Sequence, residues 1–490
     1  MLTSPGIFAV RSQFLFNIIL VILLVGCSAQ RAPASDRVSI TLTECVLSSP
    51  RIETQVDAEC GSLAVPEDPS NPEGRQIPLS IAVVPAITRS PEPDPLFILV
   101  GGPGQSAIET FPALSATVFR IHEQRDIVLV DQRGTGESNP LRCLDPAADE
   151  ILEDDRLIAL LQACPERLDA DLRFYTTDIA MQDLDRVRSL LGYERVNLFG
   201  VSYGTRAALT YLKLYPERVR SIILDAVVDP GFILYQDAAR DGQEALDQFF
   251  ARCEADEACS TIFPGLRAEF DSILQRLEAG PLEVTITHPV TGRPLDLEVT
   301  RATFTNIIFN TLYSPDLIAM LPMAIHQAYT EENYGPLISQ AYLVDAGIYD
   351  GMFYAVACTE DAPLVSAPDD EEALFGNTVH IFLEVCSAWP KGNPAEIVRA
   401  PVDSDVPILM LSGEADPITP PRHAERLAPS LGSSLHLVFD DMGHGNSASQ
   451  CTAKILDDFV ERASIADLDT GCVERVEPPP FFVDFSGPQP

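Results

Sequence analysis

One stretch, NLFGVSYGTR over residues 197–206, places a serine between two glycines where a strand pattern gives way to a helix pattern. The residues before it form a short and mostly apolar run, as expected of a buried strand. Beyond the second glycine, apolar side chains recur on one helical face. A G-x-S-x-G turn between strand and helix presents the serine hydroxyl above a sheet, and the glycines leave room for close packing. The pattern predicts Ser202 as a nucleophile, although five letters alone also fit an ordinary tight turn.

Predicted strands alternate with helices along the chain, which indicates an α/β fold with a mostly parallel, doubly wound sheet. The seven predicted strands, in chain order, cover residues 77–84, 96–100, 127–130, 196–199, 219–228, 407–412 and 435–439. A closing helix is predicted over residues 455–463. Between residues 231 and 400 the pattern becomes mainly helical. We therefore expect a helical cap at 231–400 inserted between two parts of the core, at 45–230 and 401–475, with a flexible tail over 476–490.

An acid and a histidine follow the last two predicted strands, as a nucleophilic serine requires. Asp416 lies in G-E-A-D-P after the sixth strand, and His444 lies in D-D-M-G-H-G after the seventh. His444 would take the proton of Ser202, and Asp416 would hold the imidazole in the correct tautomer. Each also has a structural interpretation, because an aspartate before proline can form a turn and a loop histidine can simply be exposed. The weaker candidates for the acid are Asp225, Asp440 and Asp441.

The negative charge that develops on a carbonyl oxygen needs two backbone N–H donors. Tyr203, the residue after the serine, is expected to supply the first. The second is expected from the loop G-G-P-G after the second predicted strand, with Gly102 preferred and Gly101 in reserve.

The N-terminus has the pattern of an export signal rather than of a folded segment. Residues 14–25 form an apolar run too short to span a bilayer, and it leads into L-V-G-C. This ending resembles a bacterial lipoprotein signal, so residues 1–26 would be removed, Cys27 acylated, and 27–44 left as a tether. Ser28 after the cysteine favours the outer membrane, facing the periplasm. An ordinary signal peptide or an uncleaved anchor is the alternative.

Ten cysteines remain when Cys27 is set aside, and an even number in an exported chain suggests disulfides. Proximity in the sequence pairs them as Cys45 with Cys60, Cys143 with Cys164, Cys253 with Cys259, Cys358 with Cys386, and Cys451 with Cys472. The sequence contains no C-x-x-C or H-E-x-x-H pattern, so neither a metal nor another cofactor is expected.

The chain of 490 residues is strongly acidic, with 72 Asp and Glu against 33 Lys and Arg and a net charge of −39. Such a charge argues against a nucleic-acid partner and slightly favours cationic over anionic substrates. The oligomeric state is not indicated.

Five motifs occur in one order: V-G-G-P-G-Q-S, V-D-Q-R-G-T-G-E-S, F-G-V-S-Y-G-T, G-E-A-D-P-I-T-P and G-H-G. Together they resemble the α/β-hydrolase serine aminopeptidases of the peptidase S33 type, which include prolyl and tripeptidyl aminopeptidases. The resemblance spans Cys45 to Cys472. Tyr203 and Val100 stand where prolyl aminopeptidases have tryptophan and histidine, so the chain looks more like the tripeptidyl branch.

The resemblance implies an α/β-hydrolase fold whose cap restricts access to the free N-terminus of a peptide. An N-terminal ammonium needs a carboxylate partner in a partly desolvated pocket. In A-C-T-E-D-A-P we expect Glu360 to hold this ammonium, with Asp361 second; the alternative is an acidic loop beside a disulfide. Residues 131–133 would shape the floor of the site. An esterase acting on small esters is the alternative function, and a binding protein with an idle hydrolase fold is a third.

Overall fold

The computed structural model describes residues 40–49, 52–144, 154–288, 292–343, 347–366 and 373–488, without the side chains of 341–343. The chain divides into two compact units, 1–39 and 40–490, and the described residues all belong to the second. The predicted signal peptide and Cys27 therefore lie outside the described residues. Within these ranges, no helix combines the length and the apolar character needed to cross a membrane.

Nine strands form the central sheet, in the order β1-β2-β3-β5-β4-β6-β7-β10-β11. Their bounds are β1 Thr43–Ser48, β2 Gln55–Pro66, β3 Gln76–Val84, β4 Leu96–Leu99, β5 Ile127–Val130, β6 Val196–Val201, β7 Val219–Asp225, β10 Ile408–Gly413 and β11 Ser434–Phe439. The strands from β5 to β11 in this order run parallel, and β1, β2, β3 and β5 pair antiparallel. The expected mostly parallel sheet is thus confirmed, whereas β1 and β2 were not predicted.

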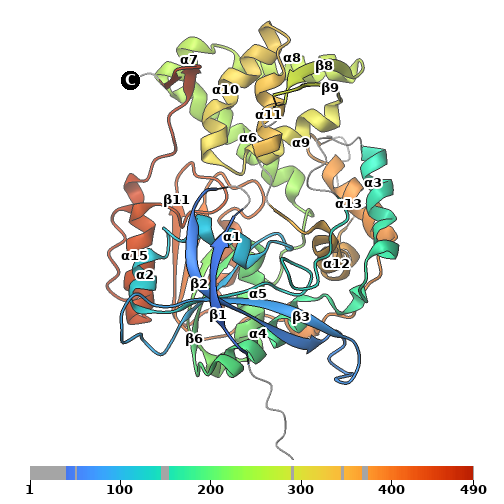
Figure 1. Ribbon diagram of the computed structural model, residues 1–490. Coiled ribbons are helices and arrows are strands. Elements are labelled where there is room, and N and C mark those ends of the chain that lie inside the picture. Colours follow the sequence, from blue (N-terminus) through green and yellow to red (C-terminus); the bar gives the residue numbers. More distant parts are fainter. Residues whose placement is uncertain are drawn as a thin grey trace, which may run out of the picture. The chain divides into compact units, whose positions relative to one another are not determined.

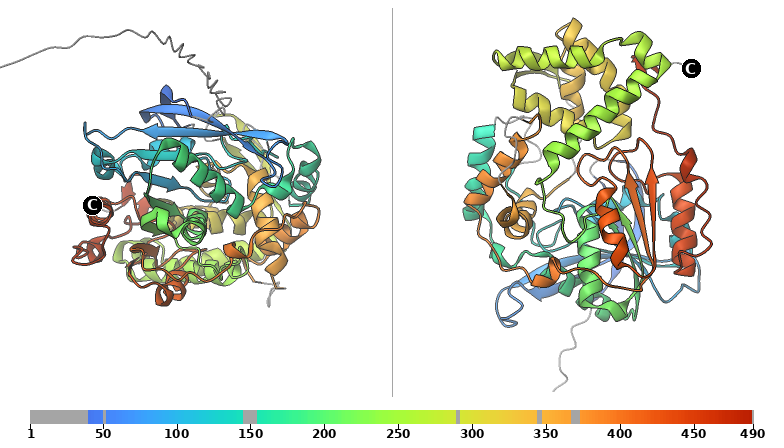
Figure 2. Two further views of the ribbon diagram at one scale, coloured as in Figure 1. Left: turned by 90° about the horizontal axis from the view of Figure 1, so that it is seen from below. Right: turned by 180° about the vertical axis from the view of Figure 1, so that it is seen from behind.

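Helices cover both faces of the parallel strands, because successive side chains of a strand point to opposite faces and both must be buried. In β4, Phe97 belongs to a buried cluster that includes residues of α4 and α5, and the next residue, Ile98, belongs to a second cluster that includes residues of α1, α2 and α15. Figure 2 shows α15 alongside the last strands of the sheet. The core helices are α1 Ala107–Leu114, α2 Phe119–Gln124, α3 Asp154–Gln162, α4 Thr177–Leu191, α5 Tyr203–Leu214, α14 Arg422–Leu427 and α15 Gln450–Arg462.

A long insertion separates β7 from β10, and its elements α7, α8, α10 and α11 gather beyond one end of the sheet (Figure 1). We call the segment between β7 and β10 the cap. Its helices are α6 Ala238–Ala255, α7 Glu257–Ile262, α8 Leu266–Glu278, α9 Arg301–Thr311, α10 Pro315–Thr330, α11 Gly335–Leu343, α12 Asp350–Glu360 and α13 Asn377–Ser387. It also holds an antiparallel pair, β8 Leu282–Thr287 and β9 Pro294–Val299, which the helical pattern did not predict.

The C-terminal segment contradicts the expectation of a flexible tail over 476–490. It forms the short strands β12 Phe482–Asp484 and β13 Gly487–Pro488, which pair with each other. Phe481 is buried, with its ring 6.0 Å from that of Phe249 and 4.2 Å from the Arg252 guanidinium. Apolar burial and a cation–π contact thus hold this segment on the cap.

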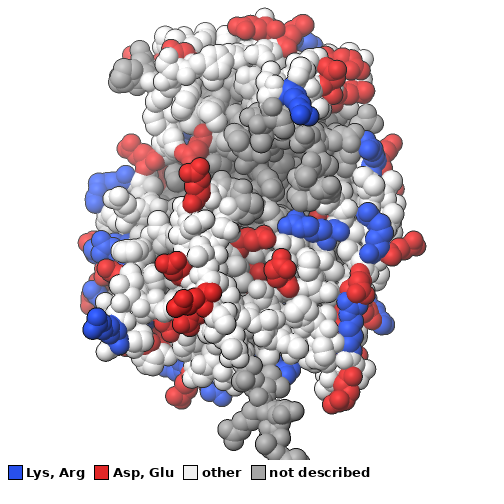
Figure 3. Space-filling view, viewed as in Figure 1, with Lys and Arg blue, Asp and Glu red and all other residues white. Residues whose placement is uncertain are grey.

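All five disulfides form with the pairing that sequence proximity predicts. Cys358–Cys386 joins α12 to α13 within the cap, where both sulfurs are buried. Acidic and basic side chains are interspersed on the face shown in Figure 3, without a broad area of either sign.

Candidate active site

Ser202 stands at the sharp turn between β6 and α5, with φ 55° and ψ −123°. Positive φ is strained for a residue with a side chain, and such strain concentrates at functional sites. Both flanking glycines are required by space. A Cβ on Gly200 would lie 2.4 Å from the Gly204 carbonyl oxygen, and one on Gly204 would lie 2.0 Å from the Leu99 oxygen. The turn therefore has the geometry that the G-x-S-x-G pattern predicts.

His444 and Asp416 meet in the two loops that follow β11 and β10. His444 Nδ1 lies 2.8 Å from Asp416 Oδ2. The other carboxylate oxygen accepts the backbone N–H groups of Ile418 and Thr419, each at 2.9 Å. The Thr419 hydroxyl donates to Asp416 Oδ2 at 2.7 Å and lies 3.2 Å from His444 Nδ1. The carboxylate is thus fixed from three sides before it meets the imidazole.

The buried pair of Asp416 and His444 supports the charges of both partners. Burial lowers the pKa of His444, but the charge of Asp416 and the hydrogen bond to it outweigh burial, so this pKa lies above its ordinary value. Burial raises the pKa of Asp416, and the charge of His444 outweighs it, so this pKa lies below its ordinary value. An imidazolium at this position is therefore stabilised, as general-base chemistry requires.

The weaker acid candidates do not contact the imidazole through a hydrogen bond. Asp225 is buried and accepts the N–H groups of Asn446 and Ser447 at 2.9 Å, so it anchors the loop that carries His444. Asp440 is exposed, and Asp441 donates its N–H to Glu414. Asp416 is therefore the acid that orients the histidine.

Ser202 and His444 line one cavity of about 330 Å³. This volume is at the lower end of the range for small-molecule sites. Most of the wall is apolar or aromatic and comes from both core and cap: Val228, Phe232, Leu234, Tyr235, Tyr313, Ile348, Phe353 and Ile418.

The loop after β4 reaches the same cavity. Gly101 and Gly102 line it together with Ser202 and Tyr203. Gly101 donates its N–H to Gln105 Oε1 at 2.9 Å, so its donor is already engaged. Gly102 has φ 105°, a conformation that only glycine adopts readily. Of the two predicted glycines, Gly102 is the better candidate for a donor to the substrate.

The segment after β5 has a structural part, as expected. Asp131 accepts the Ser106 hydroxyl at 2.7 Å and the Ile108 N–H at 3.1 Å. Arg133 is fully buried and ion-paired with Asp183 at 2.8 Å. Asp131 thus holds the start of α1, and Arg133 is tied to α4.

The two carboxylates predicted to bind the substrate, Glu360 and Asp361, occupy different environments in the structure. Asp361 lines the cavity, but its charge is already matched. Arg206 binds it through two hydrogen bonds of 2.8 and 2.9 Å, and Arg399 adds one of 2.7 Å. Glu360 lies outside the cavity lining, and its carboxylate accepts the N–H and the hydroxyl of Thr177 at 2.7 and 2.9 Å. The prediction of Glu360 as the ammonium partner is therefore wrong on position.

Burial affects these two carboxylates differently. It raises the pKa of Glu360, although the charge of Arg206 opposes it. Burial also acts to raise the pKa of Asp361, but the charge of Arg206 and the hydrogen bonds from it hold this pKa below its ordinary value. Asp361 is thus the more firmly ionised of the two.

Sequence reasoning missed Thr419 and Arg206. A threonine three residues after Asp416 is a local signal for a side chain that returns to the carboxylate. Arg206 stands within the apolar pattern that follows Ser202, and a charge at such a place signals a buried ion pair.

The sequence of this chain is similar to those of several known proteins. A family model described as alpha/beta hydrolase fold matches residues 94–447. The protein named serine protease Hip1 of Mycobacterium tuberculosis is 28% identical over 472 residues, which covers 86% of this chain and 88% of that protein. The tripeptidyl aminopeptidase of Streptomyces lividans is 34% identical over 192 residues, or 35% of this chain and 36% of that protein. Carboxylesterase B of M. tuberculosis is 27% identical over 432 residues, covering 79% and 80%.

Proposed function

Because the chain belongs to the α/β hydrolase family, we propose that it is a serine peptidase of the aminopeptidase type that forms an acyl-enzyme on Ser202. The observation that carries the proposal is the 2.8 Å hydrogen bond between His444 and Asp416, in a cavity that His444 shares with the strained Ser202. Base, orienting acid and nucleophile are then all accounted for.

The proposed reaction begins when Ser202 Oγ attacks the carbonyl carbon of the scissile amide, while His444 Nε2 takes the hydroxyl proton. The oxyanion is stabilised by the backbone N–H groups of Tyr203 and Gly102. The C–N bond then breaks, and the imidazolium gives its proton to the leaving amine. Water attacks the acyl-enzyme, His444 takes a proton from it, and the acid product leaves as Ser202 regains its proton. Asp416 stays ionised throughout and stabilises the imidazolium.

Peptide substrates are favoured by the names of two relatives, a serine protease and a tripeptidyl aminopeptidase. The way the cap meets the site also fits a restricted substrate. The backbone carbonyl of Tyr313 in the cap accepts the backbone N–H of His444 at 2.9 Å. The backbone N–H of Tyr349, also in the cap, donates to the Gly104 carbonyl at 2.8 Å. The cap thus contacts the loop that carries His444 and the glycine loop after β4. A substrate must fit within the space that the cap leaves.

Among the described residues, Asp361 is the one carboxylate that lines the cavity, so we assign it the contact with an N-terminal ammonium in place of Glu360. The charge balance at Asp361 also favours a second candidate, an esterase. Two guanidiniums already neutralise this carboxylate, and a neutral, apolar pocket suits an uncharged ester. One relative is named carboxylesterase B, and the same triad serves both reactions.

We also propose that the enzyme is exported and attached to the cell envelope by a lipid on Cys27, probed by mass spectrometry of the mature N-terminus. The support is the L-V-G-C ending of the apolar run and the even number of remaining cysteines. All five disulfides of the folded part agree with an oxidising compartment.

The test is a substrate panel on the purified mature protein. It contains aminoacyl, prolyl and Ala-Ala-Pro p-nitroanilides, each with a free and an acetylated N-terminus, together with p-nitrophenyl butyrate. Cleavage of the free-amine peptides only would support an aminopeptidase and report how many residues leave. Turnover of the ester alone would select the esterase, and equal cleavage of free and acetylated peptides would remove the assignment of Asp361.

A further inference from the structure

Glu360 ends α12 and is turned away from the cavity into a buried network. Its side chain is among the least exposed of the charged groups, at 1%. Oε1 accepts the Thr177 N–H, and Oε2 accepts the Thr177 hydroxyl and lies 3.5 Å from Arg206 Nη1. A buried carboxylate with this many donors is held in one orientation.

The network continues to the residue after the nucleophile. The Thr177 hydroxyl oxygen lies 2.8 Å from the Tyr203 hydroxyl. Because Thr177 uses its own proton toward the Glu360 carboxylate, the Tyr203 hydroxyl is the donor in this contact, which is shorter than its contact of 3.5 Å with Gln132 Oε1. A chain of hydrogen bonds therefore runs from Tyr203 through Thr177 to Glu360. The backbone N–H of Tyr203 is the donor assigned to the oxyanion.

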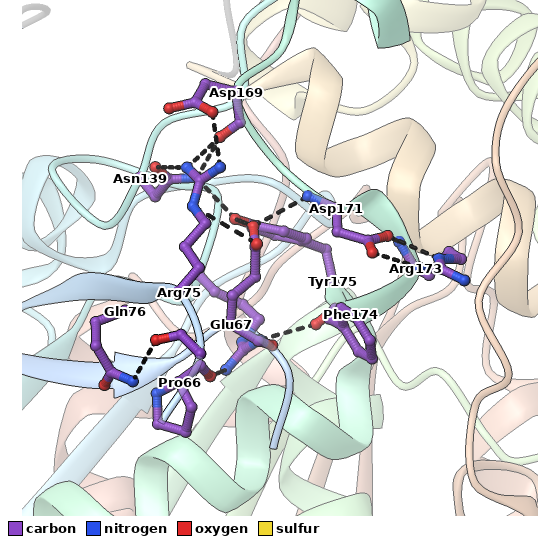
Figure 4. A network of polar contacts seen from close by, with 12 residues as sticks. Pro66, Glu67, Arg75, Gln76, Asn139, Asp169, Asp171, Arg173, Phe174 and Tyr175 are labelled. Atoms are coloured by element: carbon purple, nitrogen blue, oxygen red, sulfur yellow. Dashed lines mark hydrogen bonds and ion pairs between the residues drawn. The ribbon is translucent and has the colours of Figure 1, made fainter. Parts of the chain in front are cut away.

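Thr177, in the middle of this chain of hydrogen bonds, is held in place by the core. Thr177 begins α4, and the segment before it is anchored at several points (Figure 4). Glu67 accepts the Asp171 N–H and the Tyr175 hydroxyl, each at 3.0 Å. Arg133 donates to the Phe174 carbonyl at 3.0 Å. Thr177 thus meets Glu360 from a rigid position.

Glu360, at the end of the chain of hydrogen bonds, is held in place within the cap. Cys358, two residues before Glu360, is joined to Cys386 of α13. The neighbouring Asp361 binds Arg206, which lies on α5 three residues after Tyr203. The two carboxylates and the guanidiniums of Arg206 and Arg399 balance in charge. The cap is thus locked to the helix that carries the oxyanion donor.

We propose that Glu360 is a positioning residue that sets the oxyanion hole through Thr177 and Tyr203, so that the hole is complete only with the cap in place. The proposal rests on the acyl-enzyme function of Ser202. It gives the cap a part in the chemical step, beyond restricting the size of the substrate. It also makes a prediction opposite to that of an ammonium partner, which would act on binding of free-amine substrates alone.

The first test is Glu360→Gln. Glutamine can still accept the Thr177 N–H, but it presents an N–H group to the Thr177 hydroxyl, which then has to turn its proton toward Tyr203. Misplacement of an oxyanion donor lowers the rate of the chemical step. We expect kcat to fall about tenfold for the free-amine peptide and for the ester alike, with KM little changed for either.

The second test is a set of double variants with Thr177→Val and Tyr203→Phe, which remove the two hydroxyls of the chain. Groups that act as one unit are strongly non-additive. We expect each single variant to lower kcat by a similar factor and Glu360→Gln combined with Tyr203→Phe to be little worse than either alone. Effects that multiply would overturn the proposal.

Glu384→Gln is the matched control, because Glu384 is an exposed cap glutamate in α13 that pairs with His380. It should leave kcat and KM unchanged. A rise in KM confined to free-amine peptides in Glu360→Gln would overturn the positioning role, as would a lowered melting temperature with normal kcat. Labelling of the wild type by a fluorophosphonate distinguishes a failure of the acyl-enzyme mechanism from a failure of the role given to Glu360. An unlabelled wild type would refute the acyl-enzyme mechanism itself.

Discussion

Gly204→Ala tests whether the close approach of α5 to β4 is what the second glycine of the turn provides. The added Cβ would lie 2.0 Å from the Leu99 carbonyl oxygen and 3.0 Å from that of Val100. An ordinary contact begins near 3.4 Å, so the helix and the strand would have to separate by about 1.4 Å. The obstacle is backbone, which cannot rotate away as a side chain can.

Two free-energy terms of opposite sign decide the result. Overpacking of this kind costs about 3 kcal/mol, at the upper end of the usual range. Alanine in place of glycine contributes about 1 kcal/mol of stability in a helix interior, which is an upper bound here because Gly204 is the second residue of α5. We therefore expect the free energy of unfolding to fall by about 2 kcal/mol. The kcat/KM should fall as well, since the movement shifts Ser202 against the loop of Gly101 and Gly102.

The assay is urea unfolding followed by far-UV circular dichroism and by the fluorescence of Trp389. This residue is the only tryptophan of the chain, is buried in the cap, and donates to the Leu161 carbonyl at 3.0 Å. Gly471→Ala is the control, because its Cβ would meet a single atom at 3.8 Å. A Gly204→Ala variant that is as stable as the wild type, or more stable because alanine favours the helix, would refute the reasoning.

Two further predictions concern the pair of Asp416 and His444 and the disulfides. Asp416→Asn should lower kcat by a factor of about 10³–10⁴. Activity requires the neutral imidazole, and the variant loses the charge that raises the pKa of His444. The acid limb of the kcat/KM profile should therefore move to lower pH. An unmoved acid limb would show that another group titrates there. Dithiothreitol should lower the melting temperature, at about 2–4 kcal/mol for each disulfide opened, beginning with the half-buried Cys45–Cys60 and Cys451–Cys472; an unchanged melting temperature would contradict this.

The parallel strands were predictable because each is buried on both faces and so reads as a short apolar run, as in LFIL of β4 and IVLV of β5. The loops at their carboxyl ends then bring Ser202, Asp416 and His444 together. β1 was missed because it is an edge strand whose residues are mostly exposed, so it lacks an apolar signal. The exposed pair β8–β9 was missed for the same reason.

The orientation of Glu360 could not be predicted from its neighbours in the sequence. It is set by a hydrogen bond from Thr177 and an ion pair with Arg206, which lie 183 and 154 residues away in the sequence. The nearby disulfide and acidic neighbour are equally compatible with a carboxylate that enters the cavity. Which of two adjacent carboxylates faces a substrate is therefore a property of packing.

The central claim is that Ser202 forms an acyl-enzyme with help from His444. The direct measurement is the intact mass of the folded mature protein after treatment with a fluorophosphonate, followed by peptide mapping. We predict one adduct, on Ser202, that is absent in Ser202→Ala and formed at a strongly reduced rate in His444→Ala, while both variants keep the wild-type circular dichroism spectrum. A wild type without an adduct, or an adduct that persists in Ser202→Ala, would contradict the account.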